Sequence, residues 1–172
     1  TEHMGNDADE MGDDLSAVDL GTGRTAVAIA AGNSITGVIL DDGTVKVWGF
    51  NSSGALGQEH YSNIGDDPNE MGDNLPAVDL GTGKTAVDIA IGGNHVVVLL
   101  NDGTIKAWGY NGDGELGQGR DDNQIGEEAG DMGDNLPTTN LPDGLTAIGV
   151  AAGYNHTIAI FNNGTVGVVG KN

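Results

Sequence analysis

Carboxylate side chains gather in three acidic segments, residues 1–14, 59–73 and 121–134, which hold 17 of the 26 Asp and Glu residues. Carboxylates beside Asn and backbone carbonyl groups are hard oxygen ligands that suit Ca²⁺. The spacing is not that of an EF-hand loop, and a solvated acidic loop whose Asp and Asn residues serve turns explains the pattern equally well. Both interpretations stay open. The calcium hypothesis assigns as candidate ligands Asp7, Asp9, Glu10, Asp13, Asp66, Asp67, Glu70, Asp73, Glu127, Glu128, Asp131 and Asp134.

Two histidines and two tryptophans recur at the spacing of these segments. His95 and His156 each stand at the start of an apolar run. They could ligate a metal only if other ligands converge on them, and we favour a structural histidine hydrogen-bonded to a neighbouring turn. Trp48 and Trp108 are the largest apolar side chains, and we expect each to fill the gap between adjacent sheets.

Three Asn-X-Ser/Thr triplets, at Asn51, Asn155 and Asn163, are possible glycosylation sites. We expect Asn51 to lie in an exposed loop, which makes it the best acceptor if the chain is secreted by a eukaryote. No Ser-His-Asp arrangement or pair of catalytic carboxylates can be identified, so the sequence predicts a protein that is not an enzyme. It indicates no cofactor other than Ca²⁺.

The formal net charge of −20 argues against binding to nucleic acid or to anionic membranes, because both need a cationic surface. It fits an extracellular or cell-surface location, which we favour, and it suits divalent cations or a basic partner. The chain has no cysteine and no apolar run long enough to cross a membrane. Its first residue is not Met, so we expect a mature product or a segment of a longer protein.

The chain repeats itself at steps of 60 and 61 residues, measured between the Met-Gly-Asp motifs that begin at Met11, Met71 and Met132. We treat the 172 residues as one repeat domain with copies at about 1–58, 59–119 and 120–172. Trp48 and Trp108 are 60 residues apart, and Val169 stands where a third Trp would be.

Four strands are predicted in every copy, since short apolar runs alternate with Gly-rich turns. An Asp-Gly or Asn-Gly pair separates the third strand from the fourth, and its glycine is Gly43, Gly103 or Gly164. Such pairs predict a two-residue type I′ turn. The predicted strands are residues 15–20, 26–31, 35–40 and 44–48, then 75–80, 86–91, 96–100 and 104–108, then 136–141, 147–152, 157–161 and 165–169.

These sheets are apolar on both faces, so each must lie between neighbours. The fold class predicted is therefore all-β: a β-propeller-like array of about three four-stranded blades, partial or completed by another chain. A solenoid is the competing arrangement.

The stretch from Gly92 to Gly119 resembles the repeat of the regulator of chromosome condensation family. It has a glycine and a histidine before an apolar strand, then Asp-Gly, then Trp-Gly-x-Asn-x-x-Gly-x-Leu-Gly. The first copy has Ile35 at the histidine position, and the third has lost its Trp. The resemblance implies a propeller, usually of seven blades, in which a strand of one repeat completes the blade of another. Activities in the family include nucleotide exchange on a small GTPase, chromatin docking, ultraviolet sensing and inhibition of enzymes.

The order of the strands predicts that residues 15–20 pair with a blade before their own, which leaves an unpaired edge at each end of the array. We expect these ends to join head to tail with another copy, or with other parts of a longer protein. The function predicted is a non-enzymatic scaffold for protein–protein interaction or assembly, perhaps a unit of an extracellular structure. The alternatives are a calcium-dependent surface or adhesion protein and a regulatory binder that acts as an exchange factor or an inhibitor.

Overall fold

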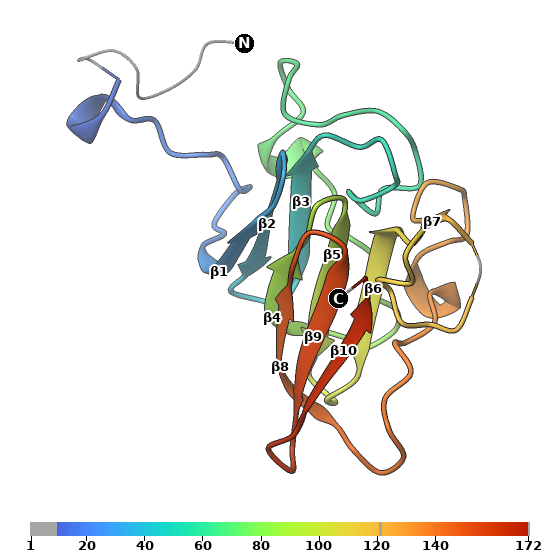
Figure 1. The fold of residues 1–172 in the computed structure, drawn as a ribbon. Coiled ribbons are helices and arrows are strands. Elements are labelled where there is room, and N and C mark those ends of the chain that lie inside the picture. The colour runs from blue at the N-terminus through green and yellow to red at the C-terminus, as the bar shows by residue number, and fades with distance from the viewer. Residues whose placement is uncertain (1–9, 121, 172) are drawn as a thin grey trace.

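The structure is a computed structural model that describes residues 10–120 and 122–171. The part that it describes is built from three antiparallel sheets stacked side by side (Figure 1). This all-β array confirms the predicted fold class. No helix in the described residues is long and apolar enough to span a membrane.

Each sheet is a meander of three main strands, which we call a blade. The first blade contains β1 (Ala26–Ala31), β2 (Ile35–Leu40) and β3 (Val45–Gly49). The second contains β4 (Ala86–Ile91), β5 (His95–Leu100) and β6 (Ile105–Tyr110), extended by the short β7 (Gln124–Ile125). The third contains β8 (Ala147–Ala152), β9 (His156–Phe161) and β10 (Val166–Gly170). The predicted second, third and fourth strands of each copy are confirmed to within two residues.

The first predicted strand of each copy is wrong as a regular strand. Residues 75–80 and 136–141 lie along the outer strand of the preceding blade, but each makes one backbone hydrogen bond there, from Val78 N to Val45 O and from Thr139 N to Ile105 O, both 2.8 Å. Pro76 and Pro137 lack the N–H that a regular ladder needs, so the segments pair without forming a strand. We call them closing segments. Their pairing with the preceding blade agrees with the prediction.

The third strand of each blade was expected to be buried on both faces. All six residues of β5 are buried, because the second blade lies between the other two. The inner strands β1, β4 and β8 approach closely, and a Cβ atom on Gly32 would lie 2.1 Å from the carbonyl oxygen of Gly92. Glycine at this position is therefore needed for the blades to converge.

The predicted type I′ turns are wrong. Only the glycine of each pair has a positive φ, 78° at Gly43, 79° at Gly103 and 81° at Gly164. The preceding Asp or Asn keeps a negative φ, and Gly43 N donates to Leu40 O at 2.9 Å. This geometry is a three-residue hairpin loop with the glycine in a bulge. Asp42 Oδ1 accepts from both the amide and the hydroxyl of Thr44, and these bonds lower the pKa of Asp42.

Three short 3-10 turns, Gly12–Asp14, Gly72–Asn74 and Gly133–Asn135, follow the methionines of the Met-Gly-Asp motifs. The sequence showed no helical pattern, and these turns are too short to create one. The turns at Gly72–Asn74 and Gly133–Asn135 position the acidic residues that join one copy to the next.

Candidate functional site

The contacts between the first and second blades define what a closed interface in this protein requires. Trp108 is fully buried, and its Nε1 donates to the carbonyl oxygen of Ala55 in the first blade at 3.0 Å. A Cβ atom on Gly57 would lie 2.8 Å from that nitrogen, so the glycine makes room for the indole ring. Trp108 thus lies between two blades. Trp48 is only half-buried, against Gly65.

Two buried lysines attach each closing turn to its blade. Lys46 Nζ donates to Leu20 O at 2.9 Å and to Gly72 O at 2.8 Å. Lys106 Nζ, at the equivalent position of the second blade, donates to Gly133 O at 2.5 Å. Burial lowers the pKa of Lys106. In both cases a lysine of one copy binds the Met-Gly-Asp turn of the next.

An aspartate of the same turn completes the attachment. Asp73 accepts from the backbone N–H of Thr22 at 2.8 Å and from its hydroxyl at 2.6 Å. Asp134 accepts from the same two groups of Thr82, both at 2.7 Å. These bonds lower the pKa of both carboxyl groups. Acidic residues of the connectors therefore hold consecutive copies together.

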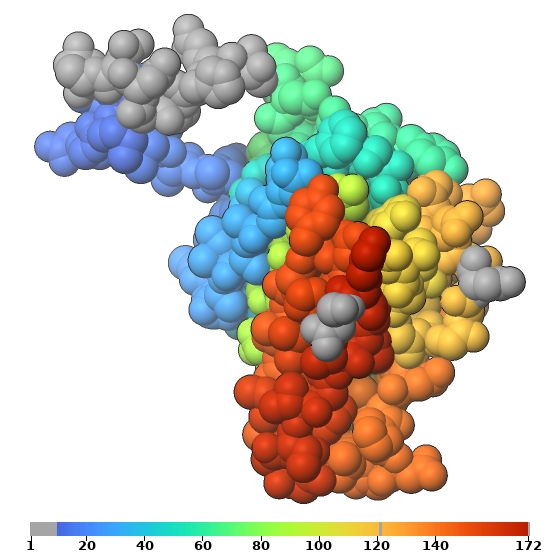
Figure 2. Space-filling model, viewed as in Figure 1, coloured from blue at the N-terminus to red at the C-terminus, as the bar shows by residue number. Residues whose placement is uncertain are grey.

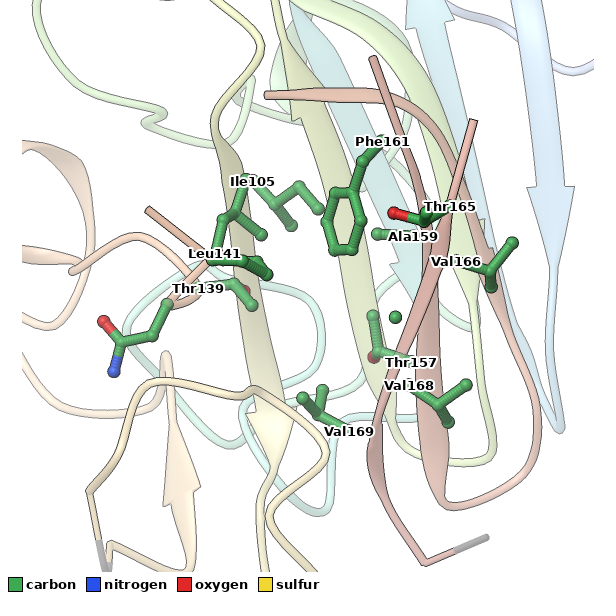
Figure 3. A pocket seen from close by; sticks show the side chains of 13 residues that line it. Ile105, Thr139, Leu141, Thr157, Ala159, Phe161, Thr165, Val166, Val168 and Val169 are labelled. Carbon is green, nitrogen blue, oxygen red and sulfur yellow. The ribbon is translucent and has the colours of Figure 1, made fainter. Parts of the chain in front are cut away.

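The third copy lacks the residues that make these contacts. Gly167 stands where the first two copies have lysine, Val169 where they have tryptophan, and Asp143 where they have threonine. The substitutions of lysine and tryptophan leave an apolar hollow of about 330 Å³ between the second and third blades. Ile105, Leu141, Ala159, Phe161 and Val169 are among its lining residues (Figure 3).

The outer face of the third blade is apolar and exposed. Ile160, Val166 and Val168 are 45%, 59% and 42% exposed. Their counterparts in the second blade, Leu99, Ile105 and Ala107, are at most 4% exposed because the third blade covers them. In Figure 2 the third blade, in orange and red, forms a face that no other described element covers. This face and the adjoining hollow are the candidate site for a partner.

His95 forms its hydrogen bond with a strand, not with a turn as the sequence suggested. Its Nε2 lies 3.1 Å from Thr157 Oγ1 of the third blade, and the side chain is 1% exposed. Burial lowers the pKa of His95 from 6.5 to about 4, and the neighbouring His156 adds to the effect. At the equivalent positions of the first and second blades, Ile35 and Val96 are both buried and apolar.

The connector carboxylates that the structure describes mostly bind backbone amides. Glu70 Oε2 accepts from the N–H groups of Gly65, Asp66 and Asp67, and these bonds lower the pKa of Glu70. Asp131 Oδ2 does the same for Gly126, Glu127 and Glu128. The described residues contain no group of three or more acidic, His or Cys side chains arranged to hold a metal ion. Asp7 and Asp9 lie outside the described residues, and Asp13 is exposed.

The expectation that Asn51 is exposed is wrong. Its side chain is fully buried: Nδ2 donates to His60 O at 2.6 Å and Oδ1 accepts from Leu56 N at 3.1 Å. A glycan on that amide could not be accommodated. Asn155 is partly exposed and donates to Asp113 Oδ2, whereas Asn163 is exposed in a hairpin loop.

Sequence reasoning also missed a buried carboxylate, Glu115. It is 1% exposed, and Asp113 N donates to its Oε2 at 3.0 Å, while Oε1 has no hydrogen-bond partner. The equivalent residue in the first copy is Ala55, so the 60-residue alignment could have identified Glu115 as unusual.

Comparisons with known proteins agree with this architecture. Two models of the regulator of chromosome condensation (RCC1) repeat match residues 86–115 and 102–160. The ultraviolet-B receptor UVR8 of Arabidopsis thaliana is 28% identical over 145 residues, which are 80% of this chain and 28% of the receptor. Protein pim1 of Schizosaccharomyces pombe is 30% identical over 149 residues, 83% of this chain and 26% of that protein. The chain thus spans about a quarter of the length of these relatives.

Solved structures show the same fold. Human WBSCR16 superposes with a TM-score of 0.67 at 20% identity, covering 85% of this chain and 33% of its own. Yeast RCC1 (Prp20) bound to Kap60 gives a TM-score of 0.59 at 21% identity, covering 84% of this chain and 32% of its own. The three blades therefore correspond to part of a larger propeller in these structures.

Proposed function

Because the chain belongs to the regulator of chromosome condensation repeat family, we propose that it is a non-enzymatic scaffold that binds another protein through its third blade. The observation that carries this proposal is the exposed apolar face of Ile160, Val166 and Val168, whose counterparts are buried in the other blades. Exposed contiguous apolar surface marks sites of interaction. The resemblance to yeast RCC1, which is bound to the protein Kap60 in a solved structure, supports a protein as the class of partner.

The experiment compares partner capture by the full chain and by a variant with a charged outer face, Ile160→Asp combined with Val168→Asp. Proteins retained by the wild type are identified and then titrated individually against both forms. We expect the variant to bind the identified partner at least tenfold more weakly. Val27→Asp is the matched control, because Val27 is equally apolar and exposed but lies in the first blade. Equal affinity of the wild type and the outer-face variant would contradict the proposal.

Head-to-tail assembly of copies is the alternative that the sequence raises. Residues 10–20 extend away from the sheets (Figure 1), and Met11, Leu15 and Val18 are about half exposed. Their counterparts in the third copy, Met132, Leu136 and Thr139, are buried. Light scattering over a hundredfold range of concentration tests this alternative, and a constant monomer mass would exclude it.

A further inference from the structure

The free edge of β10 has backbone groups positioned for another strand. In the first blade, Val45 O accepts from Val78 N, and Gly49 N donates to Ile64 O at 2.8 Å. The equivalent groups of β10 are Val166 O and Gly170 N, and the described residues make no such bond to either. An extended chain can bind at such an edge by adding a strand to the sheet.

The hollow beside this edge selects for a large apolar side chain. It is open, it is lined mainly by aliphatic groups and Phe161, and it occupies the space that Lys106 and Trp108 fill one blade earlier (Figure 3). Burial of apolar surface in such a hollow is favourable by about 25 cal/mol per Å². A strand that carried only small side chains would leave the hollow empty.

The charge at this edge differs from that at the two closed blades. There, the aspartate of each incoming Met-Gly-Asp turn binds Thr22 or Thr82, and a lysine binds the turn's glycine carbonyl. At the third blade, Asp143 replaces the threonine and Gly167 replaces the lysine. Another Met-Gly-Asp turn, including the one with Asp13, would bring two carboxylates together without a lysine to hold it. A cationic side chain would be attracted instead.

We propose that the edge of β10 binds an extended segment of another protein that carries Lys or Arg opposite Asp143 and a large apolar side chain in the adjoining hollow. This inference rests on the proposed function and specifies the chemistry of the partner. It excludes the amino-terminal segment of a second copy as the preferred occupant.

Two ten-residue peptides test the charge preference. The first, MGDNLPAVDL, is residues 71–80 of this chain, and the second has lysine in place of its Asp73. Each is titrated by fluorescence anisotropy against the full chain at 0.15 M salt. We expect the lysine peptide to bind about two- to fivefold more tightly, the range for an exposed charge pair. Asp143→Thr should abolish this preference, whereas the control Asp66→Thr, which removes one exposed charge elsewhere, should retain it.

A third variant tests the hollow. Val169→Trp restores the side chain found in the other copies, and we expect it to weaken binding of the lysine peptide at least tenfold. Circular dichroism and the melting temperature verify that the variant is folded.

Equal affinity of the two peptides, tighter binding of the aspartate peptide, or no binding of either would overturn the inference. So would self-association of the wild type that Asp13→Thr abolishes. If both peptides bind equally and Val169→Trp or a charged outer face prevents this, the scaffold function stands and only the charge selection fails.

Discussion

Trp108 of the second blade donates its indole N–H to the carbonyl oxygen of Ala55 in the first blade, at 3.0 Å. One side chain thereby combines burial of a large apolar surface with the only polar contact that its ring requires. The first and third copies differ from this arrangement in opposite ways: Trp48 is only half-buried, and Val169 is too small to reach across. The strength of each interface should follow this difference.

Trp108→Ala is expected to lower the free energy of unfolding by about 3–5 kcal/mol, the range for a buried aromatic side chain replaced by alanine. Trp48→Ala serves as the matched control and should cost clearly less, because its ring is partly in water. Urea denaturation followed by circular dichroism measures both. Equal losses would show that the interface between blades does not depend on Trp108.

His95 should make stability depend on pH. Its pKa is 6.5 when unfolded and about 4 when folded, so between these values only the unfolded state binds the proton. The contribution is complete above pH 6.5 and is lost as the pH falls towards 4, by up to about 1.4 kcal/mol per pH unit. Chemical denaturation from pH 8 to pH 4 measures the slope.

The control for this pH dependence exists within the chain. The double variant His95→Ile with Thr157→Val reproduces the apolar pair Ile35 and Val96 of the preceding interface. All carboxylates are unchanged in it, so subtracting its profile isolates the histidine. We expect a flatter profile between pH 4 and 6.5, and parallel profiles would show that His95 titrates normally.

Two hairpin glycines separate backbone strain from crowding. Gly103 and Gly164 have nearly the same φ, 79° and 81°, but a Cβ on Gly103 would lie 2.8 Å from Thr146 Cβ whereas one on Gly164 would meet nothing within 4 Å. Gly164→Ala should cost about 1–2 kcal/mol through the positive φ alone. Gly103→Ala should cost more, and thermal unfolding of the two variants gives the comparison.

The calcium hypothesis for the acidic connectors makes a direct prediction. If the connectors bind Ca²⁺, a hundredfold excess over the dissociation constant raises stability by about 2.7 kcal/mol, and the chelator EGTA reverses the effect. Asp67→Asn should reduce the response, with Mg²⁺ as the control cation. Identical melting curves in Ca²⁺ and EGTA would dispose of the hypothesis.

The hairpins were predictable because alternating apolar residues and an Asp-Gly or Asn-Gly pair are local signals. The strand bounds 26–31 and 35–40 match β1 and β2 residue for residue. The closing segments were not predictable as irregular structure, because their pairing partner lies about 30 residues away and the prolines permit only one bond. The turn type was missed because a three-residue loop and a type I′ turn use the same dipeptide.

The candidate site was less accessible to sequence reasoning. The loss of Trp at Val169 was visible, but its consequence, a hollow beside an open edge, depends on how the second and third blades pack. The burial of Asn51 could not be inferred either, because its amide binds the backbone of residues that follow it by 9 and 11 positions. Asp143 and Gly167 acquire meaning only when the contacts of Thr82 and Lys106 are known.

The closing segments also determine where the chain can be divided. Each is contributed by the copy that follows, so a cut at the start of a sequence repeat removes the last layer of the previous blade. A self-contained cassette is therefore shifted by one segment from the sequence repeat and runs from about residue 86 to residue 141. Excision or duplication of whole cassettes, joined at these shifted boundaries, should preserve every interface, whereas splicing at the Met-Gly-Asp motifs should not.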